Sequence, residues 1–112
     1  MRLRRSSQFQ RVFASGQRQA GPLFVVIAVP GGALQARLGL AVSRRCARKA
    51  VDRNRLKRVI RESFRQHQHR LPAFDIVVVA RPAAVRQQNR RLFASLDGHW
   101  QGLSPSRGEI AR

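Results

Sequence analysis

The segment 49–67 constrains the fold more than any other part of this sequence, because it combines an apolar stripe with a basic face. At about 100° per residue of an α-helix, the two sets of side chains fall on separate arcs of one helical wheel. The stripe consists of Leu56, Val59, Ile60, Ser63 and Phe64. The adjoining arc consists of Arg53, Asn54, Lys57, Arg58, Arg61 and Arg65. We therefore predict a helix that packs one side into a core and presents cations on another.

The basic face carries charges of one sign, which is not typical of a helix that is merely solvated. Solvated helices commonly pair acids with bases at i, i+4, whereas Arg53, Lys57 and Arg61 follow one another at that spacing. Each like-charge pair costs about 0.2–0.5 kcal/mol, and bound phosphates would remove that cost. The loop before the helix extends the basic surface with Arg44, Arg45, Arg48 and Lys49.

Asn54 lies inside the basic face. Its amide both donates and accepts hydrogen bonds, so it could read a base edge or a ribose hydroxyl. The alternative is that Asn54 is a simple helix N-cap.

The charge of the whole chain indicates the same kind of partner. In 112 residues, 23 Lys and Arg stand against 5 Asp and Glu, a formal net charge of +18 that internal ion pairs cannot neutralise. Lysine occurs only at Lys49 and Lys57, and the planar fork of arginine suits phosphate oxygens and stacks on bases. The pattern therefore favours nucleic acid over a membrane. Without a long apolar run or a signal peptide, we expect a cytoplasmic protein.

The remaining patterns predict one small domain over 1–100, with a disordered tail over 101–112 and a basic arm over 2–5. Phe9, Val12 and Phe13 share one face of a short helix that begins near Ser6 or Ser7 and ends at Gly16. Predicted strands cover 23–29, 37–43 and 75–80, and a second long helix would contain Val85, Leu92, Phe93, Leu96 and Trp100.

The order of these elements also predicts how the strands pair. A Gly-rich connection between the first two strands suggests a hairpin. The strand–helix–strand step across the basic helix suggests parallel pairing of its flanking strands, with a right-handed crossover under the general rule.

The acidic and nucleophilic side chains do not suggest an enzyme site. The five carboxylates are scattered along the sequence, the three histidines form no evident pair, and Cys46 excludes both an internal disulfide and a cysteine-based zinc site. We expect no catalytic residue, no metal ligand and no small-molecule substrate.

Four segments of the sequence resemble one known family. The segment 50–65, AVDRNRLKRVIRESFR, closely resembles the RNR signature of the bacterial ribonuclease P protein component. The segments 9–16 (FQRVFASG), 39–45 (GLAVSRR) and 75–81 (DIVVVAR) resemble that family's first helix, the strand before the signature and the later strand. The resemblance extends from Leu3 to Trp100.

The resemblance implies a fold and an activity. The fold would be α+β, a small two-layer α/β sandwich of order α-β-β-(β)-α-β-α. Its βαβ crossover through the basic helix would be left-handed, in place of the right-handed one above. The chain would be the protein subunit of a ribonucleoprotein that removes the 5′ leader from precursor tRNA. The RNA subunit would be the catalyst with Mg²⁺, which it would mainly hold, and the protein alone would not cleave.

The resemblance also assigns partners to residues. The catalytic RNA would contact Arg53, Asn54, Arg55, Lys57, Arg58, Arg61 and Arg65. We expect it also to contact the loop residues that extend this surface, Arg44, Arg45, Arg48 and Lys49. The single-stranded leader would contact Phe9 and Phe13 in a cleft between the first helix and the sheet, where the alternative is that both are core residues. Ile27 stands where the family often has an aromatic side chain, so leader contact would depend more on the two phenylalanines. A structural RNA-binding protein, such as a ribosomal component, remains the alternative function.

Overall fold

The structure is a computed structural model that describes residues 6–103; the basic arm 2–5 and residues 104–112 lie outside the described part. Its elements in order are α1 (Ser6–Ser15), β1 (Gln17–Ala20), β2 (Phe24–Pro30), β3 (Arg37–Ala41), α2 (Ala50–His67), η1 (Gln68–Arg70), β4 (Phe74–Ala80), η2 (Pro82–Arg86) and α3 (Asn89–Gly102). The predicted order is confirmed, including the additional strand that it allowed before the basic helix.

The four strands form one mixed sheet in the order β1-β2-β4-β3. β3 and β4 flank α2 and pair in parallel, as predicted, while β1 with β2 and β2 with β4 pair antiparallel. The predicted hairpin between the strands at 23–29 and 37–43 is wrong, because β4 lies between the corresponding β2 and β3. β4 is apolar on both of its faces, and such a strand is stable in the middle of a sheet. The handedness of the β3–α2–β4 crossover stays a prediction.

β1 had no apolar signal in the sequence. Its residues, QRQA, are polar and mostly exposed, and the strand lies at the edge of the sheet, where its backbone pairs with β2. Gly16 ends α1 just before it, as predicted. A Cβ on Gly16 would lie 2.4 Å from the carbonyl oxygen of Val12, so this tight change of direction requires glycine.

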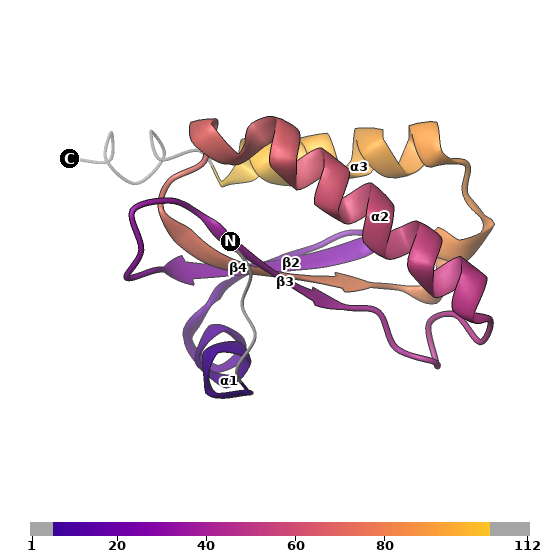
Figure 1. Ribbon diagram of the computed structural model, residues 1–112, viewed down its shortest axis with the longest axis horizontal. Coiled ribbons are helices and arrows are strands. Elements are labelled where there is room, and N and C mark those ends of the chain that lie inside the picture. The colour runs from indigo at the N-terminus through magenta and orange to yellow at the C-terminus, as the bar shows by residue number, and fades with distance from the viewer. Residues whose placement is uncertain (1–5, 104–112) are drawn as a thin grey trace.

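The sheet separates two hydrophobic cores, and Figure 1 shows α2 and α3 covering one face while α1 covers part of the other. The larger core packs the predicted stripe of α2 against α3 and the sheet. The smaller core consists of Val12 from α1 with Ile27 and Val77. The predicted sandwich is therefore present, and α1 adds a partial third layer. No helix among residues 6–103 is long and apolar enough to cross a membrane.

The predicted second long helix is divided into two pieces. Val85 belongs to the short 3-10 helix η2, and α3 begins only at Asn89. α3 then continues to Gly102, and Leu103 is only 2% exposed. Ordered structure therefore extends three residues beyond the predicted domain boundary at residue 100.

Candidate nucleic-acid interface

The basic residues of α2 lie on the arc beside its core stripe. The buried residues of the helix are Leu56, Val59, Ile60, Ser63 and Phe64, the five that were predicted. The α2 basic face consists of Arg53, Asn54, Lys57, Arg58, Arg61 and Arg65, all exposed or half-exposed. The helix thus holds its cations on a rigid support, with one side anchored by the core.

Few of these cations are neutralised within the described residues. Arg65 pairs with Glu62 at 2.6 Å, but both side chains are well exposed, so the pair is weak. Arg61 keeps a buried Nε–H that has no hydrogen-bond partner in residues 6–103. A buried donor without an acceptor costs about 1–3 kcal/mol, which an incoming acceptor could recover.

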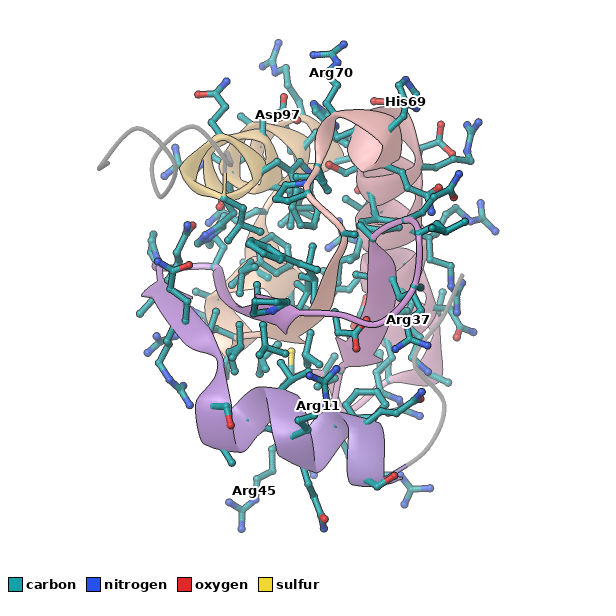
Figure 2. The ribbon with its side chains drawn as sticks, turned by 90° about the vertical axis from the view of Figure 1, so that its left-hand side faces the viewer. Arg11, Arg37, Arg45, His69, Arg70 and Asp97 are labelled. Carbon is teal, nitrogen blue, oxygen red and sulfur yellow. The ribbon has the colours of Figure 1, made fainter. Side chains whose placement is uncertain are left out.

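Arg53 connects the α2 basic face to the preceding loop. Its Nη1 donates to the carbonyl oxygens of Ala47 and Arg48, each at 2.9 Å. The predicted loop residues Arg44, Arg45, Arg48 and Lys49 are all exposed. Figure 2 shows Arg45 pointing away from the α2–α3 layer, on the side of the sheet where α1 lies. The loop therefore extends positive charge from the α2 side of the sheet toward the α1 side.

Arg55 lies outside the α2 basic face, as the helical wheel indicated. Its Nη2 donates to the carbonyl oxygen of Val85 at 2.7 Å. Its Nη1 donates to the carbonyl oxygen of Gln87 at 3.1 Å and to Oδ1 of Asn89 at 2.8 Å. The structure thus directs this arginine, which the resemblance assigned to RNA, into the connection between η2 and α3.

The other face of the sheet holds the two phenylalanines assigned to the leader. Phe13 is 43% exposed, and Phe9 is half-buried against the smaller core. The alternative that both are core residues therefore does not hold for Phe13. The Phe9 side chain packs partly into the smaller core, which agrees in part with the alternative interpretation.

Next to α1, this face of the sheet presents an apolar strip. Register aligns Ala20, Val25, Val79 and Ala41 across all four strands, so their side chains point to one side. Ala20 is exposed and the other three are half-buried. The neighbouring row places the exposed Arg18 beside Ile27. The sheet strip (Ala20, Val25, Val79 and Ala41) is therefore an apolar surface with a cation, Arg18, beside it.

Sequence reasoning missed the role of Asp75, which it counted as one of several scattered carboxylates. Asp75 is fully buried and forms ion pairs with Arg37 of β3 and Arg11 of α1. Arg37 donates through Nε and Nη2, each at 2.8 Å, and these hydrogen bonds raise the pKa of Arg37 above its ordinary value. Arg11 also donates to the carbonyl oxygen of Pro30 at 3.2 Å. In Figure 2, Arg11 points from α1 toward the sheet. Asp75 thus fastens α1 to the sheet.

Gly31 makes room for this ion cluster. A Cβ at this position would lie 2.6 Å from Oδ1 of Asp75, closer than real Cβ contacts. The glycine that suggested a hairpin in the sequence therefore serves a close approach to a buried carboxylate.

The described residues do not form a metal site. Within residues 6–103, no three His, Cys, Asp or Glu side chains gather where they could hold an ion. His67 lies 3.5 Å from Asp97, while His99 faces Gln19 at 3.2 Å. Burial lowers the pKa of His99 and raises the pKa of the Cys46 thiol, which disfavours its nucleophilic thiolate form. This donor set among residues 6–103 does not fit Mg²⁺.

Known proteins with similar sequences and structures share one family. The family model described as Ribonuclease P matches residues 1–104. The ribonuclease P protein component of Thioalkalivibrio sulfidiphilus is 43% identical over 104 residues, which cover 93% of this chain and 87% of that protein. The same component of Vibrio parahaemolyticus is 44% identical over 109 residues, with 96% and 92% covered.

Solved structures agree with this assignment. The RNase P protein of Staphylococcus aureus matches with a TM-score of 0.83 at 34% identity, covering 90% of this chain and 92% of that one. The RNase P protein of Thermotoga maritima matches with a TM-score of 0.82 at 32% identity, covering 93% and 98%. Sequence and fold together place this chain in the ribonuclease P protein family.

Proposed function

We propose that this chain is the protein subunit of ribonuclease P, the ribonucleoprotein that removes the 5′ leader from precursor tRNA, and that the α2 basic face binds its RNA subunit. The observation that carries the proposal is the single-sign face on a helix whose adjoining stripe is buried in the core. Fixed cations bind a phosphate backbone with little loss of conformational freedom, because the helix is ordered before the RNA arrives.

Individual residues of this face would act in different ways. Lys57 and Arg58 have no acidic partner among the described residues, so they can neutralise phosphates directly. Arg61 gains an acceptor for its unpaired Nε–H if a phosphate oxygen draws its guanidinium outward. Asn54 is exposed and offers its amide to a ribose hydroxyl or a base edge.

The leader of precursor tRNA would bind on the opposite face of the sheet. A single strand needs rings or apolar surface for its bases and cations for its phosphates. The exposed Phe13 and the sheet strip supply the first, while Arg18 and the loop arginines supply the second. Arg45 points to this side, so one loop could contact both RNAs.

Catalysis would come from the RNA subunit with its own Mg²⁺. No cluster of metal ligands exists among residues 6–103 on which this chain could build a metal nuclease. The contribution of the protein would then be to hold the RNA subunit and the leader in one complex, which lowers the magnesium concentration that cleavage requires by replacing ions with fixed cations.

Reconstitution tests the function. The full chain is mixed with a bacterial ribonuclease P RNA and precursor tRNA at low magnesium, and 5′ cleavage is measured. We expect cleavage to increase on addition of the chain, with none by the chain alone. No gain in cleavage or substrate affinity would favour a structural RNA-binding role such as that of a ribosomal component, and cleavage by the protein alone would refute catalysis by the RNA.

Variants then test the two surfaces separately. Log affinity for the RNA subunit should fall with log salt at a slope of roughly −4 to −5 if about six phosphates are contacted, and R58Q should flatten that slope by somewhat under one unit. F13A should weaken binding of leader-bearing substrate by about 1–3 kcal/mol, the value of one stacked base, with no change for leaderless tRNA. An unchanged slope for R58Q, or equal losses with both tRNAs for F13A, would contradict the corresponding assignment.

A further inference from the structure

A second group of arginines lies at the start of α3, outside the α2 basic face. Arg86, Arg90 and Arg91 are all exposed, and they form what we name the α3 arginine cluster. They line a shallow hollow of about 520 Å³ together with Gln87, Gln88 and Ala94. The lining contains no acidic residue, and none of the ion pairs within residues 6–103 includes these arginines.

The backbone beneath the α3 arginine cluster is held in place by Arg55. Its guanidinium bonds the carbonyl oxygens of Val85 and Gln87, which flank Arg86, and the side chain of Asn89, which precedes Arg90. The three hydrogen bonds that the Arg55 guanidinium donates therefore all go to the connection between η2 and α3. A hollow supported in this way keeps its shape without a ligand, so a ligand does not bear the cost of ordering it.

The two long helices add a favourable field at the same end of the molecule. Arg55 of α2 contacts Asn89 at the start of α3, while Ser63, further along α2, accepts a hydrogen bond from Trp100 near the end of α3. Both N-termini therefore lie at one end of the layer, as Figure 1 also shows. Helix N-termini favour anions, and Gln88, the N-cap of α3, makes no side-chain cap hydrogen bond to the first turn.

We propose that the α3 arginine cluster is a second site for the phosphate backbone of the RNA subunit, continuous with the α2 basic face across Arg55. The proposal rests on the function proposed above and widens its surface from one helix to two. Arginine forks favour phosphate oxygens, and the glutamine amides beside them can bond ribose hydroxyls. The cluster lies on the α2 side of the sheet, away from Phe13 and the sheet strip, so we assign it to the RNA subunit and not to the leader.

Matched charge removals in the full chain test this site. R90Q and R91Q each remove one cation from the cluster. R70Q removes one from η1, which follows the other end of α2, about 20 Å away at about 1.5 Å per residue of helix. Affinity for the RNA subunit is measured across a salt series. We expect R90Q and R91Q each to flatten the log–log slope by about 0.7–0.9, with R70Q retaining the wild-type slope.

A positional readout accompanies the affinities. Ala94 lines the hollow and is exposed, and Cys46 is the only native cysteine. A cutting reagent tethered at Ala94→Cys, in a Cys46→Ala background whose circular dichroism matches wild type, should cleave the RNA subunit at discrete positions. The same reagent at Arg70→Cys should cleave elsewhere or not at all.

The outcomes separate this inference from the function on which it rests. Slopes for R90Q and R91Q equal to that of R70Q, with a flattened slope for R58Q, would overturn the α3 site and keep the α2 face. Loss of leader-bearing substrate with normal affinity for the RNA subunit would overturn the assignment to that subunit. If the wild-type chain binds no ribonuclease P RNA, both proposals fall together.

Discussion

Among single residues, Asp75 has the largest expected effect on stability. Replacing it in D75N removes a buried carboxylate that pairs with Arg37 and Arg11 and leaves both cations without it. Loss of one partner from a buried pair typically costs about 3–5 kcal/mol, and we expect the lower end because the Arg11 side chain is 43% exposed. Urea denaturation measures the free energy of unfolding.

A surface carboxylate provides the control. E62Q breaks the exposed pair with Arg65 and should cost less than about 1 kcal/mol. Equal losses for D75N and E62Q would mean that the buried cluster does not hold α1 on the sheet.

Residue roles were predictable where local periodicity determines them and not where a distant partner does. The core stripe of α2, including Ser63, followed from the wheel alone. The reason for a serine there lies in Trp100, whose Nε1 donates to its hydroxyl at 2.8 Å across 37 residues of sequence. The partners of Asp75 are likewise 38 and 64 positions away. No local pattern announces such pairs.

Between elements, Arg55 joins α2 to the start of α3 through its hydrogen bonds to the η2–α3 connection. R55Q would lose three hydrogen bonds to the η2–α3 connection and leave two partly buried carbonyls without this donor, a cost of about 1–3 kcal/mol. R58Q changes an exposed side chain and should alter stability by less than about 0.5 kcal/mol. Thermal or urea unfolding of both variants measures the difference.

The salt dependence of RNA binding separates a structural Arg55 from an RNA-binding one. We expect R55Q to flatten the slope of log affinity less than R58Q does, since its donors are already used within the protein. A flattened slope with unchanged stability would instead favour the direct RNA contact that the family resemblance assigned to this position.

Element pairing was harder to predict than element position. Strand and helix segments followed from apolar patterns, but the sheet order depends on which strand is buried on both faces. β4 has that property, and it lies between β2 and β3, which were expected to be neighbours. β1 escaped detection because an edge strand can pair through its backbone alone, without apolar side chains.

For the whole molecule, the dominant physical fact is a net charge of +18 carried by a domain with few acids. Cations of the loop, the α2 basic face and the α3 arginine cluster repel one another in the folded state more than in an extended chain. A ligand that binds only the folded state stabilises it by RT ln(1 + [L]/Kd), about 2.7 kcal/mol at a hundredfold excess over Kd.

Polyvalent anions should therefore raise stability beyond what ionic strength explains. We expect low-millimolar pyrophosphate to raise the melting temperature above that in sodium chloride of the same ionic strength. At that concentration the general stabilising effect of kosmotropic salts is small, so the difference reports binding. The melting temperature is followed by far-ultraviolet circular dichroism, which reports the helix content.

A variant identifies where the anion binds. K57Q/R58Q/R61Q removes three neighbouring cations from the α2 basic face, which lowers the self-repulsion and removes the anion site together. We expect this variant to melt higher than wild type in sodium chloride and to gain less from pyrophosphate. A full pyrophosphate effect in the variant would locate the stabilising anions elsewhere, with the α3 arginine cluster as the next surface to change. Identical melting curves for the wild-type chain in the two salts would show that its charge is tolerated without any anion site.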